Sequence, residues 1–389
     1  MKKIILILII FLSFSEIYSQ NLDSVISQIS KNNLTLKSLQ KSYSADSVGN
    51  KTGIYLQNPE IEFNYLFGSP NVIGNRNDFS VSQTFDFPTA YTYKRQIAET
   101  KNQQISYSYS IQKKEIETKA KLICIDLVYY NLLINEYENR LTNAEKISKS
   151  YKAKFEIGEA NILEYNKAEL NKLNISNELN VLKIEQTALQ NQLTALNGNI
   201  AISFTDTVFT EKIIPIDFEV WFAEAVKQNP MFEYLKSEID ILEKEQKLNT
   251  AMSLPKFKAG YMSEFSTGQN FQGITVGLTV PLWENKNKNK YTQLKTIAAT
   301  DYENTLKIQF YNELKILHSQ VISMKKNIDD YKAKLQYLNN SELLYKALDK
   351  GEIGLIDYIL ELSLYYESYK TLIEMERNYN KAVVNLFKY

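Results

Sequence analysis

The sequence is poor in the residues that carry most enzyme chemistry, with one cysteine and one histidine among 389 residues. A single cysteine excludes an internal disulfide framework, and we expect Cys124 to be a small buried hydrophobe on a helix. His318 has no second histidine and no cysteine near it, which leaves almost no material for a metal site or a catalytic triad. We therefore expect no enzyme activity, no bound metal and no cofactor.

An excess of charge of one sign is also missing, because 45 basic residues balance 45 acidic residues. This balance argues against a nucleic-acid binder with a strong basic face. Long hydrophobic runs are absent too: residues 4–12 are apolar but too short to span a membrane, and no later stretch approaches the ~18 residues needed. Lys2 and Lys3 precede this run and Ser19 follows it. The pattern predicts a secretory signal peptide over residues 1–19 and an exported mature chain.

Helix breakers are scarce, with seven prolines and 12 glycines. Residues 89–214 and 282–389 contain no proline. Gly158 lies in the middle of the first stretch, and Gly351 and Gly354 are the only glycines of the second. Each long stretch is therefore predicted to form two helices that meet at one glycine-marked turn.

Apolar residues in these stretches alternate three and four positions apart, which is the seam of a coiled coil. The seam residues of the second stretch are Leu314, Leu317, Val321, Met324, Ile328, Tyr331, Leu335 and Leu338. Those of the first are Ile175, Leu179, Leu182, Leu189, Leu193 and Leu196, with Gln186 as a polar interruption. An unbroken helix from Tyr91 to Phe155 would be about 98 Å long, far longer than an ordinary globular domain needs.

Four shorter segments alternate apolar and polar residues with a period of two, which predicts strands. They cover about 59–68, 77–88, 255–265 and 271–282. The segments form two pairs, and each pair is predicted to be a hairpin, with turns at "GSPNVIGNRN" and "STGQN".

The chain is predicted to be a tandem duplication, with a first repeat over residues 20–214 and a second over 215–389. Four residues before the strands of the first repeat recur before those of the second, each 196 positions later (227 − 31 = 196). Lys31, Asn33, Leu39 and Pro59 match Lys227, Asn229, Leu235 and Pro255. The glycine turns recur as well, as "GEANILEYNKAEL" and "GEIGLIDYILEL".

Each strand is ~10 residues long with one apolar face, which is typical of an outer-membrane strand. A soluble sheet packed on a core has the same pattern and remains an alternative. Phe85, Phe87 and Trp283 at the strand ends favour the membrane, although Trp283 could also be an ordinary core residue. Four strands cannot close a barrel, and lipid does not tolerate open edges, so further subunits must supply strands. A dimer would be marginal, whereas a trimer would enclose a wide lumen faced by polar residues such as Glu60 and Lys258.

The ordered motifs "SQTFDFPTAY", "GLTVPLWENK", "YKAKFEIGEANILEYNKAEL" and "YKALDKGEIGLIDYILEL" resemble the TolC-type outer-membrane efflux proteins over essentially the whole mature chain. The resemblance implies an α+β membrane protein of long helices, with four transmembrane β-strands per chain that complete a 12-stranded barrel in a homotrimer. It also implies an α-helical barrel across the periplasm. Such a protein is the passive exit duct of a tripartite pump, joined by a periplasmic adaptor to an inner-membrane transporter.

The same resemblance implies two sets of site residues at the periplasmic tip. The turns that would dock the adaptor comprise Gly158, Glu159, Gly351, Glu352 and Gly354. Glu164 and Asp357, each six positions after a turn glycine, would line the pore constriction. Alternatively, both acids simply favour a helix start through the helix dipole.

Four positions depart from the family pattern. Lys167 and Leu360 stand where relatives often have a second acid, and Leu348 and Ile353 replace a tyrosine and an arginine that hold the tip shut in some relatives. The departures put the closing contacts in doubt but leave an acidic ring in place.

The cargo and the pump remain open at this stage. "SQTFDFPTAY" and "ANILEYNKA" resemble the heavy-metal branch, whose ducts serve cation exporters of the resistance-nodulation-division type, but drugs or other small molecules are equally compatible. The alternative function is a secreted periplasmic or surface coiled-coil structural protein or adhesin, whose hairpins pack in a soluble cap.

Overall fold

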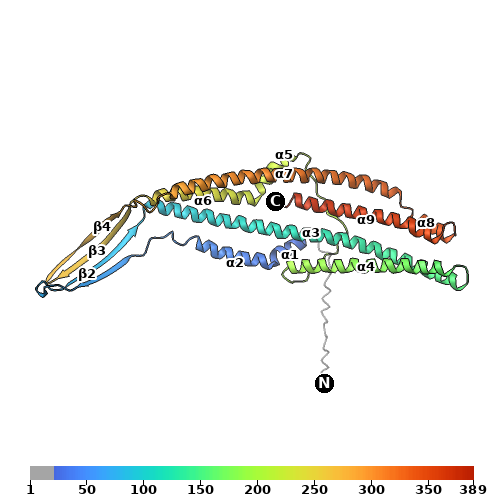
Figure 1. Ribbon diagram of the computed structural model, residues 1–389, viewed down its shortest axis with the longest axis horizontal. Coiled ribbons are helices and arrows are strands. Elements are labelled where there is room, and N and C mark those ends of the chain that lie inside the picture. The colour runs from blue at the N-terminus through green and yellow to red at the C-terminus, as the bar shows by residue number, and fades with distance from the viewer. Residues whose placement is uncertain (1–21) are drawn as a thin grey trace, which may run out of the picture. The chain divides into compact units, whose positions relative to one another are not determined.

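The computed structural model describes residues 22–389, so the predicted signal peptide lies outside the described residues. The first half of the chain contains α1 (Leu22–Asn32), α2 (Leu34–Gly49), β1 (Glu60–Leu66), β2 (Arg76–Phe85), α3 (Pro88–Glu156) and α4 (Ile162–Leu196). The second half contains α5 (Phe218–Gln228), α6 (Pro230–Met252), β3 (Lys256–Ser266), β4 (Gln269–Thr279), α7 (Lys288–Tyr337), α8 (Ser341–Asp349) and α9 (Leu355–Leu386). Figure 1 shows these elements, and a short 3-10 helix, Asn71–Ile73, lies between β1 and β2. The order of helices and strands repeats, apart from the extra helix α8.

The long helix expected before the second glycine turn is interrupted. α7 ends at Tyr337 and α8 begins at Ser341. Between them, Asn339 Oδ1 accepts hydrogen bonds from the backbone N–H of Ser341 at 3.3 Å and from its hydroxyl at 2.5 Å. Side chains of this type compete with the helix for its own backbone groups. Leu338, the last predicted seam position, is consequently exposed, whereas the seven before it are buried or half-buried.

The described chain forms two compact units, and each contains parts of both predicted repeats. The helical unit comprises residues 22–34, 116–214 and 319–388, and the sheet unit comprises residues 35–115, 215–318 and 389. The repeats 20–214 and 215–389 therefore describe the sequence symmetry and not the compact units, and their boundaries stay a prediction.

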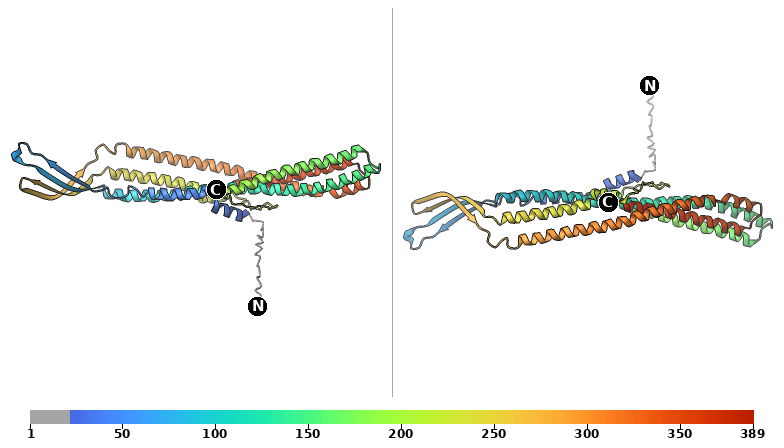
Figure 2. Two further views of the ribbon diagram at one scale, coloured as in Figure 1. Left: turned by 90° about the horizontal axis from the view of Figure 1, so that it is seen from below. Right: turned by 90° about the horizontal axis from the view of Figure 1, so that it is seen from above.

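In the helical unit, α4 and α9 lie beside the C-terminal part of α3 (Figures 1 and 2). Ile134 and Tyr137 of α3 pack on Leu179 of α4, as the seam pattern predicts. The polar interruption of the seam is satisfied, because Gln186 Nε2 donates a hydrogen bond to Asn131 Oδ1 at 2.5 Å. No described helix has the length and apolar character that a membrane span requires.

Cys124 occupies the core of the helical unit, as predicted. It is 1% exposed and packs in a cluster with Val25, Leu127, Leu193 and Phe204. The thiol is desolvated there, which raises its pKa to about 12, with the charge of a nearby aspartate as a smaller cause.

In the sheet unit, the four strands form one antiparallel sheet in the order β1-β2-β3-β4. Each strand lies within a few residues of its predicted range. The predicted "STGQN" turn is a two-residue loop in which Thr267 and Gly268 both have positive φ, 37° and 83°. Two positive φ values are the geometry of a type I′ turn, whose twist matches that of the flanking strands.

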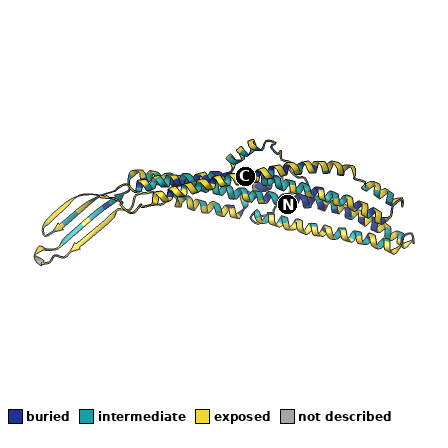
Figure 3. Cartoon of the chain, turned by 45° about the horizontal axis from the view of Figure 1, so that its top comes forward, coloured by how far each residue is buried: buried dark blue, intermediate teal, exposed yellow. Residues whose placement is uncertain are grey.

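One face of the sheet is apolar and exposed. Rows of paired residues cross this face, such as Ile61 with Val81, Val81 with Tyr261, and Tyr261 with Ile274. Ile61 is 71% exposed and Ile274 is 85% exposed, and Figure 3 shows the strands largely in the colour of exposed residues. An uncovered apolar face of this kind does not fit a soluble sheet packed on a core.

The other face of the sheet is polar and charged. Arg76 is 3.0 Å from Glu264, a residue of β3, and Lys258 is 3.2 Å from Glu60, a residue of β1. These ion pairs connect β2 to β3 and β3 to β1, as expected of a face that contacts water.

Polar contacts join the helices of the sheet unit. Lys244 Nζ of α6 donates a hydrogen bond to Thr100 Oγ1 of α3 at 2.7 Å and lies 2.5 Å from Asp240. His318 is buried, and its Nε2 is 2.6 Å from the carbonyl oxygen of Pro215. The single histidine thus has a structural contact.

Candidate functional site at the two glycine turns

The first turn ends α3 with a specific pair of backbone hydrogen bonds. The N–H of Gly158 donates to the carbonyl of Phe155 at 3.1 Å, and the N–H of Glu159 donates to that of Lys154 at 2.8 Å. Gly158 has φ = +81°. This is the Schellman motif, in which a left-handed residue lets the last helical carbonyls find donors.

The second turn, after α8, has the same geometry. The N–H of Gly351 donates to the carbonyl of Leu348 at 3.1 Å, and the N–H of Glu352 donates to that of Ala347 at 2.8 Å. Gly351 has φ = +73°, and a Cβ added to it would meet no atom within 4 Å. The backbone angle, and not lack of space, therefore requires glycine at this position. The repeated sequence motif is thus a repeated structural motif.

Glu164 begins α4 as part of a capping box. Asn161 is the N-cap, and its Oδ1 accepts a hydrogen bond from the N–H of Glu164 at 3.0 Å. In return, Glu164 Oε2 accepts one from the N–H of Asn161 at 3.0 Å. Two helix-start donors are thereby satisfied.

Asp357 occupies the same position in α9, at the third residue after the N-cap Gly354. The cap has no side chain, and Asp357 Oδ2 lies 3.3 Å from where a Cβ on Gly354 would stand. The carboxylate therefore folds back over the helix start, where negative charge is favourable. Glu164 thus caps its helix through hydrogen bonds, whereas Asp357 makes no side-chain cap hydrogen bond and only places its charge at the helix start. Their role in a pore constriction stays a prediction.

The structure brings the two turns into one packed end of the helical unit. A single apolar cluster joins Ile147 of α3 and Ala168 of α4 to residues of α8 and α9, including Leu348 and Tyr358. Leu348 is buried in the cluster and Ile353 packs against it. These two positions therefore make apolar contacts.

The remaining departures lie on the surface. Lys167 is exposed on α4, and Leu360 is 57% exposed on α9. Tyr151 of α3 packs against the same cluster, and burial followed by the charge of Glu164 raises the pKa of its hydroxyl.

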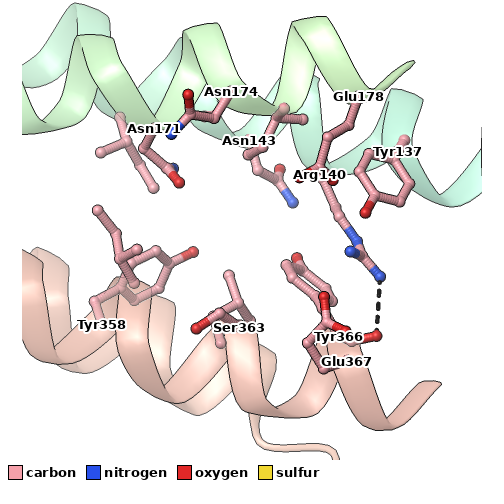
Figure 4. Close-up of a pocket in the computed structure, with 15 residues that line it drawn as sticks. Tyr137, Arg140, Asn143, Asn171, Asn174, Glu178, Tyr358, Ser363, Tyr366 and Glu367 are labelled. Carbon is pink, nitrogen blue, oxygen red and sulfur yellow. Dashed lines mark hydrogen bonds between the residues drawn. The ribbon is translucent and has the colours of Figure 1, made fainter. Parts of the chain in front are cut away.

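A crevice lined by both polar and apolar residues lies between α3 and α4 on one side and α9 on the other (Figure 4). Its volume is about 170 Å³. The polar and aromatic residues that line it are Tyr137, Arg140, Asn143, Asn171, Asn174, Glu178, Tyr358, Ser363, Tyr366 and Glu367. The crevice separates α3 and α4, which the first glycine turn connects, from α9, which follows the second.

Arg140 crosses this crevice from α3 to α9. It is 5% exposed, and its guanidinium carbon lies 3.7 Å from the centre of the Tyr366 ring and 4.5 Å from that of Tyr137. Its Nε is 3.2 Å from Glu136, and a terminal nitrogen donates to the carbonyl of Tyr366 at 3.4 Å. Burial, with Glu136 as a smaller cause, raises the pKa of Tyr366 to about 12. Burial is also the largest cause that raises the pKa of Tyr137, so both ring hydroxyls stay neutral at physiological pH.

The sequence predictions did not include Arg140. A signal was present, because Arg140 stands three residues after Tyr137 and four before Ala144, both buried, so that a charged residue interrupts an apolar seam. A buried charge must have partners. Glu136, four residues earlier on the same helix, follows from helical spacing, but Tyr366 belongs to α9 and could not be identified from one helix alone.

No protein-family model and no curated protein matches the chain. Several solved structures do. The Campylobacter jejuni CmeC outer membrane channel has 16% sequence identity and a TM-score of 0.75, over 95% of this chain and 85% of that chain. The outer membrane protein VceC from Vibrio cholerae has 10% identity and a TM-score of 0.74, over 94% of each chain. CusC, which forms a transmembrane channel, has 12% identity and a TM-score of 0.71, over 96% of this chain and 92% of that chain. The chain therefore has the fold of these outer-membrane channels, which confirms the predicted fold class.

Proposed function

We propose that this chain, which has the fold of outer-membrane channels, is the outer-membrane exit duct of a tripartite efflux pump. The observation that carries the proposal is the four-stranded sheet, which has one exposed apolar face, one charged face and two outer edges. A duct of this kind is a passive conduit and needs no catalytic group.

The sheet supports membrane insertion only as part of a larger assembly. Within the described residues, β1 and β4 each pair on one side. Unpaired backbone groups cost several kcal/mol each in lipid, so both edges require strands from other copies. Three copies supply twelve strands, enough for a barrel with a polar lumen. The apolar face then contacts outer-membrane lipid, and the face that contains Arg76, Glu264 and Lys258 lines the lumen.

The helical unit is the periplasmic part of the proposed duct. The Schellman turns, with Gly158, Glu159, Gly351, Glu352 and the cap Gly354, form the surface that docks a periplasmic adaptor. The adaptor connects the duct to an inner-membrane transporter, for which the resistance-nodulation-division type is the proposed class. Glu164 and Asp357 form the constriction of the pore.

The exported substrate is a metal cation, a drug or another small molecule. The alternative of a secreted structural protein with a soluble cap requires that the apolar face of the sheet be covered. Phe63 and Val276 on that face are 64% and 77% exposed. The proposed duct accounts for this exposure and the soluble cap does not.

The mass of the purified protein in detergent tests the proposal. The expected result is three copies per particle, in protein that is recovered from the outer-membrane fraction and forms ion-conducting pores in planar bilayers. A stable monomer with full β content, or a protein that remains soluble without detergent, would contradict it.

A further inference from the structure

The segment after β4 presents a patch of exposed apolar residues. β4 ends at Thr279, and beyond it Val280, Leu282 and Trp283 are 58%, 67% and 80% exposed. Because of this exposure, Trp283 is not a core residue. Tryptophan concentrates where a membrane meets water, because its ring is apolar and its N–H is polar.

Three exposed lysines follow directly. Lys286, Lys288 and Lys290 form no ion pair with any described residue, and Lys288 Nζ only donates a hydrogen bond to Asn285 Oδ1 at 3.0 Å. Glu284 is the sole acid between residues 280 and 300, and it is already paired with Lys256 at 3.3 Å. The segment is therefore locally cationic, although the whole chain is neutral.

Helix stability does not account for these cations. α7 begins at Lys288 and has no acid in its first turn, whereas negative charge is the favourable sign at a helix start. The segment that follows β2 in the first repeat differs in its charge. α3 begins at Pro88, and the first cation after β2, Lys94, is neutralised by the buried Asp86 at 2.8 Å.

The strand order places this segment at one end of the sheet. In an up-and-down antiparallel sheet, β1 and β3 begin where β2 and β4 end. The exposed Tyr55 and Leu56 before β1, and Phe87 after β2, therefore mark the same end as Trp283. Figure 1 shows α7 starting at this end of the sheet.

We infer that residues 280–290 form an anchoring surface for anionic phospholipid headgroups in the periplasmic leaflet of the outer membrane. This inference rests on the proposed function and names a lipid partner for it. Leu282 and Trp283 enter the interface, and Lys286, Lys288 and Lys290 reach the phosphate groups with long side chains whose charged ends stay in water. A soluble polyanion would bind the lysines but would leave the adjacent apolar residues uncovered, so the combination favours a bilayer surface.

Lipid enrichment tests the inference. The full-length trimer is reconstituted in vesicles of phosphatidylethanolamine with a minor share of phosphatidylglycerol, extracted in mild detergent, and the co-purified lipids are measured. Wild type should be enriched in phosphatidylglycerol about two-fold or more over the bulk share. The triple variant Lys286→Gln, Lys288→Gln and Lys290→Gln should lose this enrichment. The triple variant Lys37→Gln, Lys149→Gln and Lys326→Gln, with the same charge change at other exposed positions, should keep it.

Flotation of the same proteins separates failure of the inference from failure of the proposed function. If wild type floats with vesicles and is not enriched in phosphatidylglycerol, or if both triple variants behave alike, the proposed anchoring surface is wrong. The proposed duct is not contradicted by either result. If wild type does not float with any vesicle, both the proposed duct and the proposed anchoring surface are wrong. Enrichment that declines as salt is raised supports an electrostatic contact with headgroups.

Discussion

Arg140 makes its contacts through the shape of its side chain as well as through its charge. The flat guanidinium stacks on Tyr366 of α9 while it pairs with Glu136 of its own helix. A lysine would keep the charge but lose the stacked plane and the second donor. This single residue therefore connects α3 to α9 across the crevice.

We predict that Arg140→Lys destabilises the helical unit by about 1 kcal/mol, the size of a partly desolvated cation–π contact. Thermal unfolding in detergent, followed by circular dichroism, measures the change. Lys146→Arg, on an exposed position of the same helix, is the matched control and should have no effect. Equal melting temperatures for wild type and Arg140→Lys would show that the stack contributes nothing.

Cys124 should be unreactive in the folded protein. Its thiol is buried, and its pKa is raised to about 12, whereas the thiolate is the reactive form. Because the folded pKa lies above the unfolded value, the buried thiol stabilises the fold at neutral pH, and this contribution declines as pH rises from about 9 towards 12.

Labelling with a chromogenic disulfide reagent at pH 8 checks this prediction. We expect reaction at least about ten-fold slower than in denaturant, because both access and ionisation are suppressed. Rapid stoichiometric labelling of folded protein at pH 8 would contradict the burial of this side chain.

At the scale of elements, the glycine turns define where the long helices reverse. Gly351→Val should strain the turn, because a β-branched residue resists positive φ and the left-handed conformation costs about 1–2 kcal/mol. We expect the variant to insert in membranes normally but to crosslink poorly to its adaptor. Gly351→Asn is the matched control, since asparagine tolerates this conformation.

Insertion and crosslinking must be measured on the same preparations. Intact adaptor crosslinking in Gly351→Val would mean that the turn is not the docking surface. Loss of insertion in both variants would instead point to a folding defect.

The elements differ in how far the sequence could predict them. The strands and both glycine turns were predicted because alternation and positive-φ glycines are local signals that depend on nearby residues only. The break before α8 was missed because Asn339 and Asn340 also suit the exposed face of a continuous helix, and the side-chain hydrogen bonds that end α7 do not appear in a periodic pattern. The capping box at Asn161 and Glu164 was not predicted, although a capping residue three positions before an acid is its sequence signal.

At the scale of the whole molecule, the sequence repeat did not predict the compact units. Each unit combines helices of both repeats, because the contacts are made between segments far apart in the chain. The apolar cluster around Leu348 and the stack of Arg140 on Tyr366 are contacts of this kind. Which helix covers which seam depends on side-chain shape across the interface, and a single sequence does not reveal it. The sequence therefore predicted most of the helices and strands, but it did not predict which residues contact one another at the site.

The proposed trimer makes a prediction about ion flow. Each of Glu164 and Asp357 would be present three times near one axis, and the mutual repulsion of the carboxylates would be relieved by a multivalent cation between them. Wild-type pores in planar bilayers should therefore be blocked by a trivalent cation. We expect the double variant Glu164→Gln and Asp357→Asn to lose most of that block without a change in trimer yield.

These substitutions are chosen to separate the two roles of the acids. Glutamine also completes a capping box, so Glu164→Gln removes the charge and keeps the acceptor for the N–H of Asn161. Substitution by alanine would remove both, and a lost block could then reflect a damaged helix start. Glu159→Gln with Glu352→Gln is the matched control, because it neutralises two acids of the adjacent turns. If the block persists in the first pair, or disappears equally in the control pair, the constriction lies elsewhere and both acids act only at the helix starts.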